Sequence, residues 1–518
     1  MRTTPPGARA VDNMAAARAS IGQRMATGVV WVVGSRLLVR LLGVISTLIL
    51  ARLLQPSDYG LIALATAFAA AVELLGAFNF DVWLVRHRSP SAAHYDTVWT
   101  LSLLRGVVIA VILFVAAEGV AVVFSEPRLT DVLRVLALGT LAASITNVGI
   151  TDFQRDLRFD REFAYLGLAK FGSFLVAVLI AVWLRTYWAL LAGIVAGQLL
   201  RVYLSFRLSP YRPRWSLLHW REVFGFSKWL LAGNVFGFAY LQSGTFILGR
   251  LSGADAVGFY MVAREISDLA SSEIIAPIRR VLLPGYANLH NDTTLLQRSF
   301  IDGFGLIGLF GLPCAAGIVA SAEPLVATLL GPQWGPTVDL IRVLGVYALT
   351  SIAMANQGPI LLAMGHSRLL TLLMALGVLL LVPSFIAAVL IDGLAGAVIA
   401  TSAVNVVLFA VSLGVTARVV GVAPVEVFRV TWRAIFAAGV MGVSVWTLAD
   451  YLGAGHAAPV LNLLVCVISG AIVYLAVLAG LWIAGGRTAG PEQAAYAYFV
   501  QRLPRGAGGL SATKEARK

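Results

Sequence analysis

The sequence predicts an all-α integral membrane protein with about fourteen transmembrane helices. Hydrophobic residues make up 59% of the 518-residue chain and charged residues only 13%, whereas soluble domains carry about 25% charged residues. Apolar runs recur along the chain, and Lys and Arg form short clusters between them. Because so few charges cannot cover a soluble protein of this size, the excess apolar surface is expected to face lipid.

Membrane-spanning runs need roughly 20 apolar residues each. The run at 258–282 is the weakest candidate because it carries Arg264, Glu265, Asp268 and Glu273. We retain it because the loop charges alternate only with it in place. No connecting loop is long enough to form a soluble catalytic domain. The predicted spans are 27–51, 61–85, 97–124, 132–151, 165–184, 189–207, 226–251, 258–282, 300–320, 338–360, 368–391, 394–416, 430–450 and 459–484.

Basic residues predict the orientation of the chain. Of the 39 Lys and Arg residues, 27 fall in the tails and loops on the side of the two termini, and six fall in the opposite loops. This bias places both termini in the cytoplasm. The net charge of +13 is spread over these clusters and forms no nucleic-acid-binding patch. Residues 1–26 form a cytoplasmic N-tail, and residues 485–518 form a basic C-tail that is expected to be disordered.

An internal repeat appears at an offset of 198 residues. The segment Ile49–Leu53 returns as Ile247–Leu251, and Gly60 returns as Gly258. Six spans separate the copies, so both halves enter the membrane in the same direction, a plan known from transporters. We expect two six-helix lobes around a central cavity; a duplicated scaffold without transport is the alternative. The predicted divisions are the N-lobe 27–222, the C-lobe 223–416 and two additional spans within 417–484.

Six basic residues lie within predicted spans, where charge is costly and suggests function. The first five lie in the cytoplasmic halves of N-lobe helices, which suits a phosphate or diphosphate substrate. Lys170 and Arg201 lie near helix ends and can instead extend to the interface. Arg36 and Arg105 lie deeper, at about 13 Å, where extension is harder. The substrate-binding candidates are Arg36, Arg40, Arg105, Lys170, Arg201 and Arg264.

Acidic residues within predicted spans are candidates for ion or proton coupling, with structural ion pairing as the alternative. Arg264 and Asp268 are four residues apart and are expected to pair within their helix. A span this polar is expected to line a water-filled cavity, and Pro277 and Pro284 permit a bend after it. The coupling candidates are Glu73, Asp81, Glu265, Asp268 and Glu273.

Enzyme and cofactor signatures are missing from the sequence. There is no Walker A, GxSxG or HExxH motif and no paired Cys/His ligand set. Cys314 and Cys466 lie in apolar runs, where a disulfide or a metal site is not expected. Four histidines in loops or at helix ends are expected to be solvated: His219, His290, His366 and His456. The chain is therefore predicted not to be an enzyme and to bind no metal or cofactor.

Several short motifs resemble the multidrug/oligosaccharidyl-lipid/polysaccharide exporter superfamily, and within it the polysaccharide transporter (Wzx-type) flippases. They run from about residue 30 to residue 370, and the span pattern continues the match to 484. The motifs are Leu48–Leu54 followed by Pro56–Gly60, Thr97–Leu101 followed by Leu104–Gly106, Asp156–Phe159, Pro284 before Leu289–Asp292, Leu329–Trp334, and Leu361–Ala363 followed by Met364–His366.

This resemblance implies two six-helix lobes around a V-shaped cavity, plus two C-terminal helices. It implies a flippase of the bacterial inner membrane that moves an undecaprenyl-diphosphate-linked oligosaccharide from the cytoplasmic to the periplasmic leaflet by alternating access. The lipid tail would stay among membrane lipids, and the product would feed exopolysaccharide, capsule or O-antigen synthesis. A polysaccharide polymerase and a chain-length regulator are the pathway partners it suggests. Cationic cavity residues are a feature of such flippases and agree with the basic residues found above.

Three other functions remain open. An ion-coupled drug exporter of the same superfamily is disfavoured because its cavity tends to carry acids for cationic drugs. A flippase for the peptidoglycan lipid precursor fits the fold but not the motifs at Pro56–Gly60 and Leu329–Trp334. A membrane polysaccharide polymerase or ligase would be expected to need a large periplasmic loop, which the span pattern lacks.

Overall fold

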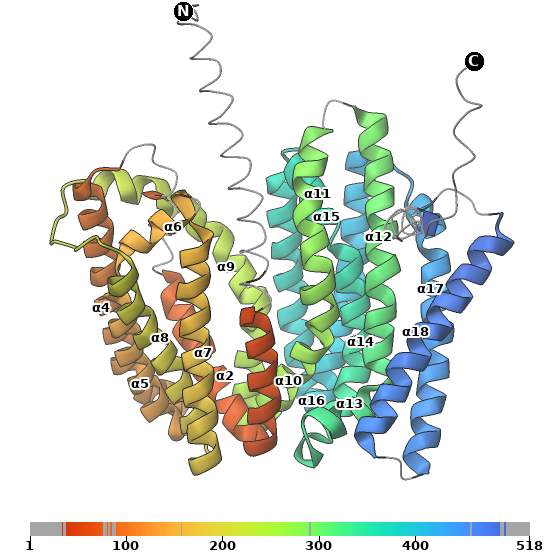
Figure 1. Ribbon diagram of the computed structural model, residues 1–518, viewed down its shortest axis with the longest axis horizontal. Coiled ribbons are helices and arrows are strands. Elements are labelled where there is room, and N and C mark those ends of the chain that lie inside the picture. The colour runs from red at the N-terminus through yellow and green to blue at the C-terminus, as the bar shows by residue number, and fades with distance from the viewer. Residues whose placement is uncertain are drawn as a thin grey trace, which may run out of the picture. The chain divides into compact units, whose positions relative to one another are not determined.

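The computed structural model describes residues 34, 38–75, 80, 83, 84, 90–156, 158–289, 292–455, 458–486, 490, 492 and 493, and all regular structure among them is helical (Figure 1). The chain forms two compact units. Unit 1 comprises Met1–Val262, Leu329–Thr337 and Val378–Ala400, and unit 2 comprises Ala263–Thr328, Val338–Gly377 and Thr401–Lys518. The predicted lobe boundaries at 222/223 and 416/417 stay predictions.

Unit 1 begins with a helical segment over residues 38–53. A short helical stretch, η1 (Val148–Ile150) and α6 (Thr151–Arg155), joins α5 to α7. The longer helices are α2 (Pro56–Leu75), α4 (Ala92–Phe124), α5 (Arg128–Ser144), α7 (Phe159–Leu184), α8 (Trp188–Leu208), α9 (Trp220–Leu251) and the first part of α10 (Gly253–Leu269).

Unit 2 continues α10 without a break through the π-helical segment η2 (Ala270–Ile275) into α11 (Ala276–Asn288). Its other helices are α12 (Thr293–Ala320), α13 (Ala322–Leu329), α14 (Thr337–Met354), α15 (Gln357–Ala363), the ends of α16 (Ser367–Val420), α17 (Pro424–Ala454) and α18 (Pro459–Ala484). The short helix η3 (Pro332–Trp334) belongs to unit 1.

Nine helices in the described part of the chain are long and apolar enough to cross a membrane. This confirms a multi-pass all-α membrane protein, while the count of fourteen spans stays a prediction. The single helix α16 contains two predicted spans. Its backbone leaves helical geometry at Asp392 and Gly393, and a Cβ at Gly396 would lie 2.1 Å from the carbonyl oxygen of Ala388. The chain therefore doubles back at 392–393, at the break between the predicted spans 368–391 and 394–416.

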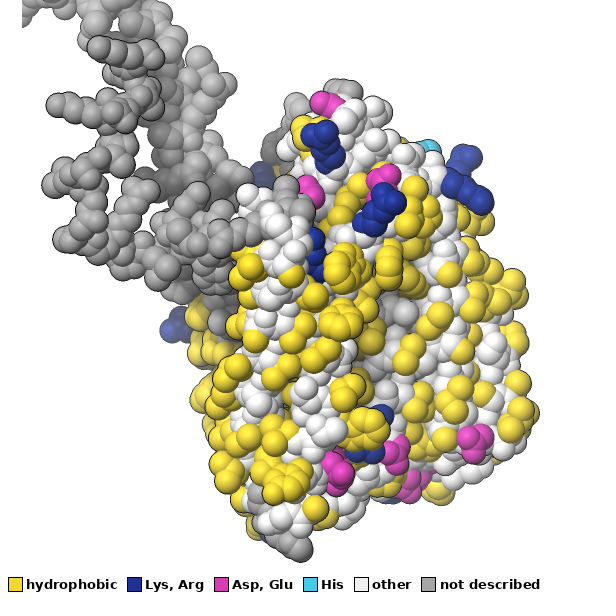
Figure 2. All heavy atoms as spheres, turned by 90° about the vertical axis from the view of Figure 1, so that its right-hand side faces the viewer, with side chains coloured by type: hydrophobic (Ala, Val, Ile, Leu, Met, Phe, Trp, Pro, Cys, Tyr) yellow, Lys and Arg dark blue, Asp and Glu magenta, His cyan; other side chains and the backbone are white. Residues whose placement is uncertain are grey.

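The surface of the molecule has the pattern expected of a lipid-facing helix bundle. Figure 2 shows one face, on which hydrophobic side chains cover a broad middle zone and charged side chains gather toward its two ends. Large apolar side chains stand exposed along whole helices, among them Val115 of α4, Trp183 of α7 and Ile472 of α18. In water such a surface would drive aggregation, so it indicates contact with hydrocarbon.

Two motifs that lie far apart in the sequence pack together in unit 1. Both Gln333 and Trp334 donate side-chain N–H groups to the carbonyl oxygen of Ala51, each at 2.8 Å. The indole of Trp334 is fully buried and makes an edge contact with Tyr59. The carboxylate of Asp58 accepts the backbone N–H of Gln55 at 3.1 Å and so fixes the turn that opens α2. These motif residues therefore build the scaffold.

Helices α2 and α10 cross with their backbones in direct contact. A Cβ at Gly60 would lie 1.7 Å from the carbonyl oxygen of Ala254, and a Cβ at Gly258 would lie 2.0 Å from that of Pro56. Pro56 and Gly60 are the residues that the 198-residue repeat relates to Ala254 and Gly258. The contact is thus reciprocal, as expected when two equivalent segments meet at a two-fold axis, and only glycine fits at either position.

The helix that starts as α10 changes its winding where the sequence predicts a bend. Residues Ala270–Ile275 form a π-helical turn, directly before Pro277 in the first turn of α11. Pro284 lies inside α11, whose helix continues past it. π-Helical turns within α-helices occur often at functional sites. The predicted span 258–282 is thus the middle of one helix that extends from 253 to 288, with an irregular turn in place of a break.

We predict that Gly60→Ala and Gly258→Ala each destabilise the protein by about 1–3 kcal/mol or more, because each added methyl group forces a backbone carbonyl away. The measurement is thermal unfolding of the purified protein in detergent. Gly119→Ala on α4 is the matched control, because nothing lies within 4 Å of a Cβ there, and helix propensity then favours alanine. Equal stability of Gly60→Ala and Gly119→Ala would show that the crossing is not tight.

Candidate functional site

Four of the predicted cavity cations belong to unit 1 and can be placed. Arg40 lies on the helical segment 38–53, Arg105 on α4, Lys170 on α7 and Arg201 on α8. The first three are half-buried, and Arg201 is exposed. Arg36 and Asp81 lie outside the described residues.

The hairpin of α7 and α8 brings Lys170 and Arg201 to one level. A Cβ at Gly172 would lie 2.2 Å from the side chain of Leu200. Lys170 precedes Gly172 by two residues and Arg201 follows Leu200 by one. Because the two helices run in opposite directions, both cations are displaced toward the same end of the bundle from the Gly172–Leu200 contact. Their heights along the bundle therefore differ by no more than about 2 Å.

Arg40 joins this level through the packing of segment 38–53 on α7. A Cβ at Gly167 would lie 3.2 Å from the side chain of Leu38, and the C-terminal parts of the same two helices share a buried apolar cluster. The helices therefore run side by side in the same direction. Arg40 is two residues beyond Leu38 and Lys170 is three beyond Gly167, so their heights differ by about 2 Å.

Arg105 lies within one helical turn of the same level. A Cβ added at Gly106, the residue after Arg105, would lie 2.1 Å from the Cβ of Ser144 at the end of α5. The register between α5 and α8 is given by the backbone N–H of Asn147, which donates to Ser205 Oγ at 3.0 Å. Carried across this register, Arg105 corresponds to a position on α8 about three residues, or about 5 Å, from Arg201.

Lys170 and Arg201 point away from the lipid-facing sides of their helices. On α8, the exposed apolar residues Leu199 and Tyr203 mark the lipid side, and Arg201 is two residues from each, about 160° away around the helix. On α7, Lys170 is about 140° from the exposed Leu175. Both side chains therefore lie opposite the exposed apolar residues of their helices. This is the placement expected of cavity-lining residues, and cavity lining by both stays a prediction.

Arg40 and Arg105 lie at different angles from the exposed apolar residues of their helices. Arg40 is about 100–140° from the exposed residues Leu41 and Ile45. Arg105 lies at the edge of the exposed stripe of α4, about 60° from Val108. Its guanidinium interacts electrostatically with the carboxylate of Glu73 on α2. Arg105 therefore turns from the lipid side toward α2.

Glu73 is the exposed acidic residue of helix α2. Helix α2 is the most buried of the candidate spans in the described part of the chain. Among its residues 56–74, whose side chains are described, Glu73 alone is exposed. Because a carboxylate is costly in hydrocarbon, this exposure agrees with a water-accessible position. The pair with Arg105 fits the predicted structural ion pair, and coupling by this residue stays a prediction.

Loop residues cover the first turns of α4, while the predicted depth of Arg105, about 13 Å, stays a prediction. Helix α4 begins at Ala92, before the predicted span start of 97, and segment 209–219 covers its first turns. In this segment the backbone N–H of Arg214 donates to Asp96 at 2.9 Å, and that of Ser216 donates to Thr100 Oγ1 at 3.1 Å. Arg105 is only five residues, about 8 Å, beyond the last of these loop contacts.

The charged residues of unit 2 have a different arrangement. Arg264 forms the predicted pair with Asp268, at 3.9 Å between Nε and Oδ2. Its guanidinium also lies over the ring of Tyr347, 5.5 Å from the centroid. Glu265 and Glu273 are exposed, and Glu273 lies in the π-helical turn, where its carboxylate accepts the hydroxyl of Ser272 at 2.8 Å. Arg264 is thus in contact with Asp268 and Tyr347, and its predicted cavity role stays a prediction.

One group of polar residues was missed by the sequence analysis. His219 was expected to be solvated, but its side chain is only 29% exposed and its ring stacks on His94, with 3.8 Å between centroids. Glu222 completes the group. His94 lies more than 120 positions before His219 and Glu222, so no local spacing could reveal the complete group.

Comparison with known proteins assigns the fold to a family. Residues 49–339, more than half of the chain, match the family described as polysaccharide biosynthesis protein. The chain belongs to this family. It is 21% identical over 66% of its length to the lipopolysaccharide biosynthesis protein WzxC of Escherichia coli, of which the match covers 71%. It is 24% identical over 58% of its length to the succinoglycan biosynthesis transport protein ExoT of Rhizobium meliloti, with 61% of that protein covered.

Among solved structures, the chain resembles the lipid II flippase MurJ in an inward closed conformation. The TM-score is 0.70 at 12% identity, and the match covers 88% of this chain and 99% of that one. At this identity the likeness shows the fold, which is that of a membrane transporter.

The positions of the cations generate a prediction about water access. In a background with Cys314→Ala and Cys466→Ala, single cysteines that replace Lys170 or Arg201 are expected to react with a water-soluble maleimide. Both positions lie opposite the lipid-facing residues of their helices. Cysteines at Leu175 and Leu199, on the same two helices, are expected to react at least about tenfold more slowly, since a thiol in hydrocarbon rarely forms the reactive thiolate. Labelling rates in membrane vesicles provide the measurement. Equal rates at all four positions would contradict the interior placement.

Proposed function

We propose that the protein is a flippase for an undecaprenyl-diphosphate-linked oligosaccharide. The observation that carries the proposal is the single layer of cations in unit 1, with Arg40, Lys170 and Arg201 turned away from lipid and Arg105 at its edge. A layer of fixed positive charge facing water inside the membrane suits a polyanionic head group, and the diphosphate is the most highly charged part of such a lipid. The family and the transport role in the name of ExoT support this direction.

The cation layer contains two types of basic side chain, which bind phosphate in different ways. Arg40, Arg105 and Arg201 present planar guanidinium groups that bind phosphate oxygens in pairs, while Lys170 supplies a compact charge. The diphosphate would be held at one height in the bundle, so the sugars extend into the aqueous opening. The prenyl chain would remain in the surrounding bilayer, because its transfer into water is unfavourable.

Glu73 would link substrate binding to proton uptake. In the substrate-free state its carboxylate compensates Arg105. A bound diphosphate competes for the same guanidinium, and the carboxylate it displaces is then favoured to take up a proton. Substrate binding and proton uptake would thus be linked at one ion pair, so a proton is the coupling ion that this geometry favours.

The proposal includes the cellular setting. The charge bias of the loops places both termini in the cytoplasm and the chain in the bacterial inner membrane, so the cation layer would load substrate from the cytoplasmic leaflet. A polysaccharide polymerase and a chain-length regulator would act on the product at the periplasmic face. A drug exporter for cationic compounds is disfavoured, because a cation layer repels such substrates.

The triple variant Arg40→Ala/Arg105→Ala/Lys170→Ala is expected to lower polymer export at least about tenfold, since a single hydrogen bond to a charged group contributes about 1.5–3 kcal/mol. The lipid-linked repeat unit should accumulate in the cytoplasmic leaflet. The measurements are cell-surface polymer and extracted lipid-linked oligosaccharide, each normalised to the amount of inserted protein.

Arg185→Ala is the matched control, because Arg185 is an exposed residue that ends α7, and it should export polymer normally. The charge-conserving variant Arg105→Lys should retain more activity than Arg105→Ala. Normal export by the inserted triple variant would refute the cation layer as the substrate site.

A further inference from the structure

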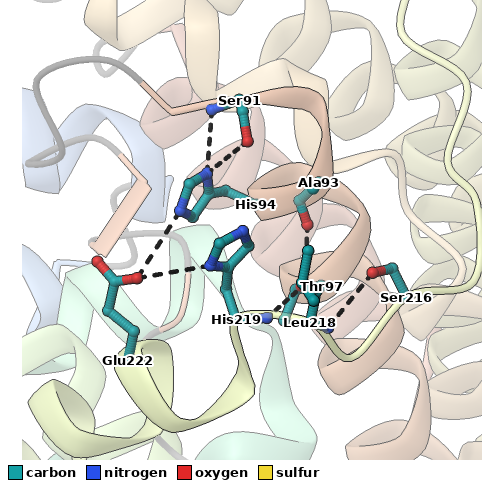
Figure 3. A network of polar contacts seen from close by, with 8 residues as sticks. All are labelled: Ser91, Ala93, His94, Thr97, Ser216, Leu218, His219 and Glu222. Carbon is teal, nitrogen blue, oxygen red and sulfur yellow. Dashed lines mark hydrogen bonds and ion pairs between the residues drawn. The ribbon is translucent and has the colours of Figure 1, made fainter.

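His94, His219 and Glu222 converge at the junction of α4 and α9, outside the cation layer (Figure 3). His94 comes from the first turn of α4, His219 from the residue that precedes α9, and Glu222 from the first turn of α9. Nε2 of His94 lies 3.8 Å and Nδ1 of His219 lies 3.7 Å from the same carboxylate oxygen of Glu222. All three potential ligand atoms lie within 4.8 Å of one another.

The local structure holds both imidazoles in place. At Ser91, which precedes α4, the backbone N–H donates to Nδ1 of His94 at 3.0 Å, and the hydroxyl oxygen lies 2.7 Å from the same nitrogen. The ring of His94 also stacks on Trp83, with 5.4 Å between centroids. The backbone N–H of His219 donates to Thr97 Oγ1 at 3.4 Å, which fixes segment 209–219 to α4. The cluster is therefore held by its surroundings on two sides.

We propose that these three residues bind a divalent transition-metal ion, for which zinc is the best fit. Two imidazole nitrogens and one carboxylate are a donor set that zinc uses with a fourth position left to water. Zinc bonds of about 2.0–2.1 Å in a tetrahedron place ligand atoms about 3.4 Å apart. The observed nitrogen–oxygen distances of 3.7 and 3.8 Å need to shorten by a few tenths of an ångström. The two stacked imidazole rings, whose planes are 17° apart, must also rotate so that both nitrogen lone pairs point at the ion.

The protonation of His94 gives the proposal a specific requirement. Because Nδ1 accepts the backbone N–H of Ser91, the neutral ring in the metal-free state carries its proton on Nε2. Metal binding at Nε2 would move that proton to Nδ1, so the backbone N–H of Ser91 would have to release Nδ1 while the hydroxyl oxygen of Ser91 accepts the new N–H, the outer hydrogen bond typical of metal-binding histidines. The ring stays neutral through this change, and no co-reactant is required.

Accessibility and charge are compatible with an ion that enters from water. The side chains of His94, His219 and Glu222 are 12%, 29% and 50% exposed, so Glu222 can meet the ion first. A bound ion would tie the first turn of α9 to the first turn of α4 and hold segment 209–219 between them. Metal binding would thus stabilise the connection between α4 and α9.

The test is equilibrium binding of Zn²⁺ to the full-length protein in detergent, without a polyhistidine tag and in competition with a coloured chelator. We expect one tight site per chain in the wild type. His219→Ala and Glu222→Gln are expected to weaken it at least about tenfold, since each removes one ligand. His366→Ala removes an exposed histidine elsewhere and should bind Zn²⁺ as the wild type does. Affinity should also fall when the pH is lowered from about 7.5 to about 5.5, because imidazole ligands must be neutral.

Thermal unfolding separates a lost site from a lost fold. Zn²⁺ should raise the unfolding temperature of the wild type and of His366→Ala, but not that of His219→Ala or Glu222→Gln, whose metal-free unfolding should stay close to that of the wild type. Absence of saturable binding in the wild type, or equal binding in all four proteins, would overturn the proposal and leave the cluster as a hydrogen-bonded network. These measurements do not involve export, so they stand or fall independently of the flippase function.

Discussion

The cost of placing an ionised side chain in hydrocarbon governs the arrangement of this protein. The four placed cations of unit 1 could have been spread over the bundle, each extended toward the nearest head groups. They instead share one level, and the two with the clearest angular positions, Lys170 and Arg201, face opposite to the apolar stripes of their helices. Such an arrangement agrees with the proposed water-filled site. Glu73, the one exposed residue among 56–74, adds a carboxylate that interacts with Arg105.

The motifs that carry the family likeness serve a different purpose from the cations. Asp58 fixes a turn, Tyr59 packs on Trp334, and Gln333 binds the carbonyl oxygen of Ala51. Together these contacts define how two distant segments of unit 1 dock. This explains why such motifs identify the fold but carry no information on the sugar that is transported.

Much of the fold was predictable because each helix carries its own signal. The break at Asp392 and Gly393 lies where the apolar pattern is interrupted, and the repeat at an offset of 198 identified the pair of glycines that touch. The depth of Arg105 stays a prediction, and hydropathy did not register that polar loop residues cover the apolar start of α4. The cluster of His94 and Glu222 was missed for another reason: it forms by tertiary contact between segments that are unrelated in sequence.

The crossing of α2 and α10 has a consequence for the origin of the chain. If both halves descend from one ancestral segment, two copies of that segment would have met through the same glycine, as an isologous dimer contact. In such a homodimer one mutation alters both sides of the interface at once. After gene fusion each side can drift separately, and Pro56 and Ala254 already differ. Gly60 and Gly258 have remained alike because neither can be exchanged while the opposing carbonyl stays in place.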